Sequence, residues 1–229
     1  MESSAMNADD FRLLIEAGDV DGIQRALEAE PALANRTIHW FLNQENESDP
    51  LHYVSDCFSN GWLLNGKESQ IAEMLLAHGA AIDGTGDRES PLIGSASLGA
   101  ELVSKVLLDA GAATEKTSIF GARALHWAAW IGTPASVERL VAHNANIEAR
   151  CTEFGATPLY WAVHGHGPDG PKQKKDQIGA ARALIRAGAS VETSNRRGIS
   201  ALELAKLCER RDMYELLQQC VGGVRVNQD

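Results

Sequence analysis

The sequence predicts an all-α fold in which about six helix-turn-helix units stack into one solenoid, interrupted by two long insertions between paired helices. Three observations predict it: residues 121–148 read as one complete helical unit, one ending recurs along the chain, and matching leucines recur at steps of 41, 33, 34 and 43 residues. Those leucines are Leu51, Leu92, Leu125, Leu159 and Leu202. Two short helices with one apolar side each cannot bury a core alone, so every unit needs neighbours.

The complete unit has clear start and stop signals. Residues 124–131 are almost wholly apolar, which predicts an inner helix. Gly132 ends that helix because glycine accepts a positive φ, and Thr133 and Pro134 then supply an N-cap and a first-turn proline for a second helix. We expect Asn144 to close the second helix in the left-handed conformation.

The same segments recur elsewhere in the chain. Four endings resemble one another: LLAHGAAID (75–83), LLDAGAATE (107–115), LVAHNANIE (140–148) and LIRAGASVE (184–192). Four beginnings do so as well: SPLIGSA (90–96), ALHWAA (124–129), TPLYWAV (157–163) and SALELA (200–205). With a period near 33 residues, the pattern resembles the ankyrin repeat family over about residues 8–218. The resemblance implies stacked helix pairs whose inner helices line a concave side, and it leaves the binding partner open.

The resemblance gives a single repeat domain, residues 1–220, followed by a C-terminal tail, residues 221–229. We expect the repeats at about 8–36, 48–83, 88–115, 121–148, 154–192 and 195–220. The first and last carry more charge on their outer sides, as terminal repeats that face water do.

Two segments are longer than the complete unit permits, residues 59–69 and residues 165–176. The first contains Trp62, Leu63 and Leu64, which a solvated loop has no reason to carry, so we expect it to fold back onto apolar surface. The second begins GHGPDGP, where glycine and proline predict a loop rather than a helix.

Composition and charge exclude several classes of function. The formal charge of −10 and the pI near 5.2 argue against binding of a phosphate backbone, so we expect no nucleic-acid partner. No apolar run reaches the length of a membrane span, and the first residues contain no export signal. Four unevenly spaced cysteines without a CxxC pair favour reduced thiols and therefore a cytoplasmic location.

Stacking places matching positions of the inner helices in rows, and two rows are rich in aromatic residues. One row reads Tyr53, Gly94, Trp127, Trp161 and Leu204, and the next reads Asp56, Ser97, Trp130, His164 and Leu207. The aromatic rings either fill space between adjacent inner helices or outline a recess with a few polar groups. Glycine inside a helix indicates that space matters, so we expect a gap beside Gly94. The candidate ligand- or partner-binding residues are Tyr53, Asp56, Trp62, Ser97, Trp127, Trp130, Trp161 and His164.

The rows contain no recognisable catalytic constellation. Ser97 and His164 are two repeat steps apart, far beyond the reach of a nucleophile and its base, and nothing in the sequence places a histidine beside Cys57. The run HGHGP offers two histidines and no third ligand, so we predict neither a metal site nor a cofactor. The resemblance implies that His52 and His126 bond the loops between repeats rather than act as bases.

Three functions remain open at this point. The first is a protein-binding module that uses its concave inner-helix surface, with a protein partner and no membrane. The alternative is a small-molecule binding protein or enzyme whose aromatic pocket is covered by the two insertions, and the third is a structural or regulatory subunit. The pocket requires Trp62 to be largely buried against at least one of Tyr53, Trp127, Trp130 and Trp161, as a lid would be.

Overall fold

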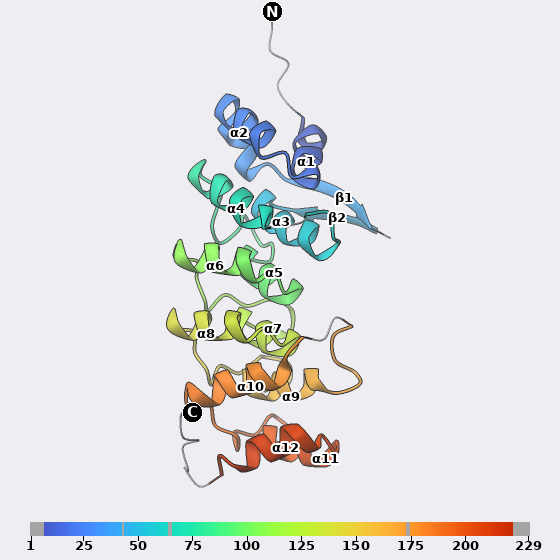
Figure 1. Ribbon diagram of the computed structural model, residues 1–229, viewed down its shortest axis with the longest axis vertical. Coiled ribbons are helices and arrows are strands. Elements are labelled where there is room, and N and C mark those ends of the chain that lie inside the picture. Colours follow the sequence, from blue (N-terminus) through green and yellow to red (C-terminus); the bar gives the residue numbers. More distant parts are fainter. Residues whose placement is uncertain (1–6, 43, 64–65, 173–174, 222–229) are drawn as a thin grey trace, which may run out of the picture. The chain divides into compact units, whose positions relative to one another are not determined.

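The structure is a computed structural model that describes residues 7–42, 44–63, 66–172 and 175–221. The described residues form twelve α-helices, two short 3-10 helices and one two-stranded sheet (Figure 1). They fall into two compact units, residues 1–113 and residues 114–229. The chain is thus mostly helical, as expected, while Leu64 and the predicted tail after Val221 lie outside the described residues.

In the first unit, consecutive helices pack in pairs, and the inner helices of neighbouring pairs pack on one another. The elements are α1 (Ala8–Ala17), α2 (Val20–Ala29), η1 (Pro31–Asn35), β1 (Ile38–Leu42), β2 (Gln44–Ser48), α3 (Pro50–Ser59), α4 (Lys67–Ala77), α5 (Pro91–Leu98) and α6 (Glu101–Asp109). Large apolar side chains fill the space between the helices and are fully buried, among them Phe11, Ile15, Ile23, Leu27, Leu51, Ile71, Leu75, Leu92 and Leu107. Each pair therefore buries its apolar side on its neighbour.

The second unit repeats this arrangement. Its elements are η2 (Ile119–Gly121), α7 (Ala124–Ile131), α8 (Pro134–Ala142), α9 (Pro158–His166), α10 (Gln177–Arg186), α11 (Ala201–Leu207) and α12 (Arg211–Gln218). Helix α9 packs on both α7 and α11, and each outer helix packs on its own inner helix (Figure 1). The buried side chains that join them include Leu125, Val137, Leu140, Leu159, Leu184, Met213 and Leu217.

The predicted helix ends within residues 121–148 are confirmed. Helix α7 has the predicted bounds, Gly132 follows it at φ 83°, and Asn144 follows α8 at φ 62°. Pro134 occupies the first turn of α8, but Thr133 does not cap that helix through its side chain. Its hydroxyl donates instead to the carbonyl of Ala128, at 3.2 Å.

A repeated hydrogen bond is found in both units. A side-chain oxygen in the segment before a helix pair accepts a backbone N–H from the loop after the outer helix of that pair, two positions after the glycine or asparagine that follows the helix. These bonds, which we call the clips, are Ala81 to Asn35 (2.7 Å), Ala113 to Asp83 (2.9 Å), Asn146 to Glu115 (2.9 Å) and Ser190 to Glu148 (2.7 Å). Each clip satisfies an N–H that no helix pairs.

The predicted all-α fold is confirmed in that the described residues are mostly helical, and residues 38–48 are a local exception to it. Strands β1 and β2 pair there as an antiparallel hairpin in which Ile38 lies opposite Ser48. Strand β1 contacts α1 and strand β2 contacts α3, so the base of the hairpin is built into the first unit (Figure 1). Ile38 and Ser48 are accordingly buried.

The predicted limits of both insertions are also too wide. Helix α3 runs to Ser59 and α4 begins at Lys67, so both ends of the first segment are helical. Helix α9 continues to His166, and the glycine at 165 does not break it. The second segment is therefore a loop only after this point, and residues 173–174 lie outside the described part of the chain.

Candidate functional site

The eight candidate residues divide between the two units. Tyr53, Asp56, Trp62 and Ser97 belong to the first unit, and Trp127, Trp130, Trp161 and His164 belong to the second. The structure thus describes two separate groups, and a recess that combines them stays a prediction.

Trp127 lies at the centre of an aromatic cluster in the second unit. Its ring meets that of Trp130 edge to face at 5.7 Å between centroids, and that of Trp161 at 5.1 Å. Trp161 is buried, whereas Trp127 and Trp130 are half-buried. The indole N–H of Trp127 donates to the hydroxyl of Ser118 at 2.8 Å. This bond and the two ring contacts fix the orientation of the Trp127 side chain. We call these three rings the tryptophan cluster.

A glycine allows the helices that carry the cluster to approach closely. A side chain at Gly165, in α9, would place its Cβ 2.3 Å from the carbonyl oxygen of Trp130 in α7. Only glycine fits this contact. Gly165, which the sequence suggested as part of a loop, therefore determines how close α9 lies to α7.

His126 lies beneath the cluster and has the structural role that was predicted. Its imidazole accepts the N–H of Arg123 at 3.2 Å and donates from Nε2 to the carbonyl of Ala156 at 3.2 Å. Burial lowers the pKa of His126 to about 4, so the ring is neutral at physiological pH. The imidazole also packs edge to face on Trp161, at 5.5 Å.

His164 lies at the rim of the second unit, in the last turn of α9. Partial shielding from water lowers its pKa, and the nearby Arg210 cation lowers it further. The next histidine, His166, faces Asp212 at 3.1 Å. In the part of the chain that the structure describes, no three histidine, cysteine or acidic side chains gather as metal ligands.

The loops that precede α7 and α9 add an exposed aromatic pair, which the sequence analysis missed. The rings of Phe120 and Phe154 lie 5.7 Å apart and both are partly exposed, with Ile119 beside Phe120 in the chain and 66% exposed. The carbonyl of Phe120 accepts the N–H of Glu153 at 3.1 Å, which ties the two loops together. Phe120 adopts φ 63°, an uncommon conformation for a bulky residue. The sequence signal that could have predicted this pair is the presence of large apolar residues at turn positions.

In the first unit, Tyr53 is fully buried and its hydroxyl donates to Glu16 at 2.5 Å. Its ring lies 5.6 Å from that of Trp40 and 6.4 Å from that of Trp62. The predicted contact of Trp62 with Tyr53 is confirmed, but the prediction that Trp62 is largely buried is wrong, because its side chain is 37% exposed. Trp40, from the unpredicted hairpin, covers Tyr53 and leaves Trp62 at the edge, in T-shaped contact at 6.2 Å.

Asp56 is buried within a short polar chain. Its carboxylate accepts the hydroxyl of Ser48 at 3.0 Å, and Ser48 in turn accepts the indole N–H of Trp40 at 3.2 Å. Burial raises the pKa of Asp56, against the opposing effects of His52, 3.9 Å away, and of the Ser48 hydroxyl. Burial also raises the pKa of the Cys57 thiol, which disfavours its nucleophilic thiolate. These groups are arranged to stabilise the fold.

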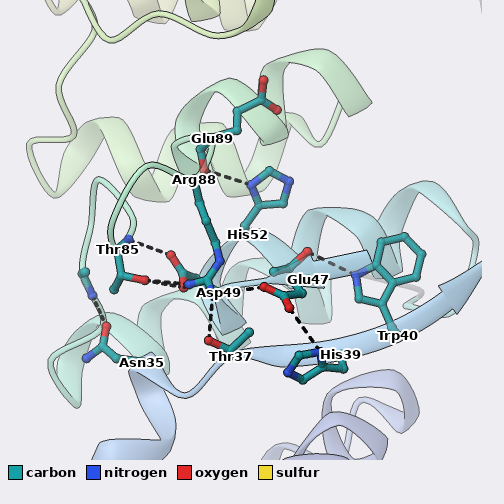
Figure 2. Close-up of polar contacts among 12 residues, drawn as sticks. Asn35, Thr37, His39, Trp40, Glu47, Asp49, His52, Thr85, Arg88 and Glu89 are labelled. Atoms are coloured by element: carbon teal, nitrogen blue, oxygen red, sulfur yellow. Dashed lines mark hydrogen bonds and ion pairs between the residues drawn. The ribbon is translucent and has the colours of Figure 1, made fainter. Parts of the chain in front are cut away.

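The expected gap beside Gly94 does not exist. A Cβ at this position would lie 2.5 Å from Cε1 of His52, so the imidazole fills the space that the missing side chain leaves. His52 donates from Nδ1 to the carbonyl of Glu89 at 3.3 Å, which confirms its predicted bond to the loop between helix pairs (Figure 2). Ser97, one turn after Gly94, bonds the carbonyl of Gly94 itself at 3.1 Å.

Comparison with known protein families agrees with this architecture. Residues 92–169 match the family model described as ankyrin repeats in three copies. The matched stretch begins at the second residue of α5 and includes α6 to α9 and the whole tryptophan cluster. Among the described residues, no helix is both long and apolar enough to span a bilayer.

Proposed function

The chain is an ankyrin repeat protein, and on this premise we propose that it is a protein-binding module whose partner contacts the inner-helix surface of the second unit. Ankyrin repeats are in general protein-interaction modules. The observation that carries the proposal is the tryptophan cluster, in which Trp127 and Trp130 are held in fixed orientations and remain half-buried.

Such rings have the properties of interface anchors. Tryptophan is enriched among the residues that dominate binding energy, because one rigid side chain contributes a large contact area. The contacts of Trp127 with Ser118, Trp130 and Trp161 fix its orientation before a partner arrives, which lowers the entropy lost on binding. Ser118 belongs to the loop that also carries Phe120, and we propose that Phe120 and Phe154 extend the same contact surface.

The surroundings favour a partner segment with apolar side chains. Tyr160 packs against the same buried residues as Trp127 and Trp130. We propose that His164, at the end of the same helix, and Arg210, whose guanidinium donates to the carbonyl of Val163, supply polar contacts to the partner. Four free cysteines agree with the cytoplasmic location that we propose.

The test is a pull-down from native lysate with the full chain as bait, comparing wild type with Trp130→Ala. Leu102→Ala is the control, because Leu102 is a large apolar residue on the outer helix α6, which is not part of the proposed surface, and is 45% exposed. We expect Trp130→Ala to lose at least one captured protein that Leu102→Ala retains, with circular dichroism unchanged in both. Identical captured proteins for all three baits would refute the use of this surface. Ser118→Ala, which leaves all rings in place, serves as the milder variant.

A thermal-shift screen with metabolites separates this function from the small-molecule alternative. A compound that raises the unfolding midpoint of wild type and not of Trp130→Ala would favour a ligand pocket at the cluster. We expect no such compound, because we propose that Trp127 and Trp130 anchor a protein partner and do not line a closed pocket.

A further inference from the structure

The hairpin of the first unit has two faces of different character. Side chains alternate along a strand, so Ile38 and Trp40 point to one face while His39 and Phe41 point to the other. In the antiparallel register, His39 lies opposite Glu47 and Phe41 lies opposite Glu45. The first face packs on the unit through Trp40, as described above. The second face, made of His39, Phe41, Glu45 and Glu47, is the outer face of the hairpin.

Arg88, from the loop before α5, holds the hairpin in place. Its guanidinium pairs with the buried carboxylate of Asp49 at 2.9 Å, donates to the hydroxyl of Thr37 at 2.9 Å and lies 3.5 Å from the carboxylate of Glu47. Figure 2 shows these three contacts on either side of the hairpin base. Asp49 also accepts the N–H and hydroxyl of Thr85. The outer face is therefore presented on a fixed support.

The outer face places an exposed aromatic ring directly opposite the acidic residue Glu45. Phe41 is 74% exposed, the largest value among the exposed large apolar side chains of the described residues. The side chains of Glu45 and Glu47 are 66% and 54% exposed, and both lie within 4 Å of His39, at 3.8 and 3.6 Å. Because most of the Phe41 ring is exposed, its burial contributes little to the stability of the fold.

The charge of the first unit determines which partner fits this face. Residues 1–113 carry 19 acidic and six basic side chains, a formal charge of −13, whereas residues 114–229 carry 12 and 15, a charge of +3. The net negative charge of the chain therefore comes from the unit that carries the hairpin. Such a field attracts cations and repels phosphate backbones and acidic peptides.

We propose that the outer face of the hairpin binds a basic segment of a partner protein. A lysine or arginine of that segment stacks on the ring of Phe41, where the ring quadrupole attracts a cation, and its charged group reaches the carboxylate of Glu45, opposite Phe41 in the hairpin. Apolar side chains next to that cation cover the remainder of the ring. This surface belongs to the other unit and is independent of the tryptophan cluster.

The chemical class of the partner segment follows from the exposed ring of Phe41 together with the negative charge around it. An uncharged apolar segment would bring no lysine or arginine to the carboxylate of Glu45, which is unfavourable, whereas Glu47 already lies 3.5 Å from Arg88. Nucleic acid is repelled by the same carboxylates. A second copy of the chain would bring a unit of charge −13 against its equal in a symmetric dimer, which opposes association.

The experiment is a selection of displayed 12-residue random peptides on the full-length chain, in parallel with the variant Phe41→Ser/Glu45→Lys. Because Phe41 and Glu45 are exposed, we expect this variant to fold, and its melting curve checks this. Glu45→Gln, which keeps the size of the side chain, is the milder variant. Leu13→Ser in α1, where the side chain is 52% exposed, is the control for loss of an exposed apolar group of the same unit.

We expect peptides that bind wild type and not the double variant to carry lysine or arginine beside apolar residues. In fluorescence polarisation with one such peptide, the double variant weakens binding by about tenfold or more, Glu45→Gln by about threefold, and Leu13→Ser by less than about twofold. Binding to wild type weakens as salt is added. These effects remain in a Trp130→Ala background, because the tryptophan cluster is a separate surface.

Four results would overturn the proposal. Peptides retained equally by wild type and the double variant would place binding elsewhere. Selected peptides that are neutral or acidic would contradict the chemistry of the partner, as would an absence of any selected peptide. Self-association of wild type in size-exclusion chromatography that Phe41→Ser abolishes would make a second copy the occupant.

Discussion

Replacing Gly94 by alanine sets two opposing effects against each other within one helix. Alanine is a better helix former than glycine by about 1 kcal/mol in a helix interior, which alone would stabilise α5. The added Cβ, however, meets Cε1 of His52 at 2.5 Å and Nε2 at 2.7 Å, against about 3.5 to 4.0 Å for carbon atoms in contact. The outcome depends on whether the His52 ring can move by about 1 Å.

The contacts of His52 indicate that this movement is costly. Displacing the ring breaks its 3.3 Å bond to the carbonyl of Glu89, a loss of about 1 kcal/mol, and overfilling a packed site costs about 1 to 3 kcal/mol. Set against the helix-propensity gain, the net expectation is a destabilisation of about 1 to 3 kcal/mol. For a chain of this size the unfolding midpoint falls by about 2 to 4 °C for each kcal/mol.

A double-mutant cycle with His52→Ala isolates the contact. In the His52→Ala background the ring is absent, so Gly94→Ala should become neutral or stabilising by up to about 1 kcal/mol. The measurement is the thermal midpoint by circular dichroism at 222 nm for wild type, both single variants and the double variant. A Gly94→Ala protein that melts above wild type while His52 is present would refute the reasoning.

The other predictions concern His126, Arg88 and Gly165. The pKa of His126 is about 4 in the folded chain and ~6.5 in the unfolded chain. Between these two pH values the unfolded chain therefore binds one more proton than the folded chain. The free energy of unfolding falls by about 3 kcal/mol as the pH falls from 6.5 to 4. We expect His126→Gln to flatten this part of the curve of melting midpoint against pH. Arg88→Ala should lower the free energy of unfolding, measured by chemical denaturation, by about 1 to 2 kcal/mol, because Asp49 then stays buried without its cation. The loss is limited because Arg88 is itself one third exposed. Arg88→Lys should lower it by less. Gly165→Ala forces its Cβ to 2.3 Å from the backbone of Trp130, so we expect a lower melting midpoint and an altered near-ultraviolet spectrum; an unchanged spectrum would contradict the close approach of α7 and α9.

The helix pair at residues 124–142 could be predicted because its signals are local. Gly132, Pro134 and Asn144 act on the φ angles of their own positions, and the structure shows each where the sequence suggested it. The row of tryptophans was predictable for a similar reason, since stacking of equal units brings equal positions together. Trp127, Trp130 and Trp161 do meet, and their use by a partner stays a prediction.

The hairpin could not be predicted in this way because its stabilising contacts join residues far apart in sequence. Arg88 bonds Thr37 across 51 positions, and Trp40 packs on Tyr53 of the following helix. The same holds for the gap that was wrongly expected beside Gly94, because the ring that fills it comes from a different helix pair. Periodicity reports which side of a helix is apolar and says nothing of which neighbour occupies a given space.

The clips bear on how a chain of this kind could gain or lose whole helix pairs. Asn35, Asp83, Glu115 and Glu148 differ in side-chain length and charge, yet each presents one oxygen to one backbone N–H at 2.7 to 2.9 Å. The donor is a main-chain group, so it is present whatever residue stands there, proline excepted. A duplicated or transplanted helix pair would therefore form its clip again, provided that the segment before it keeps an oxygen-bearing side chain and that its apolar sides pack on its new neighbours. For the clips, grafting residues 121–148 into another array of this kind would need that one matched position on each side.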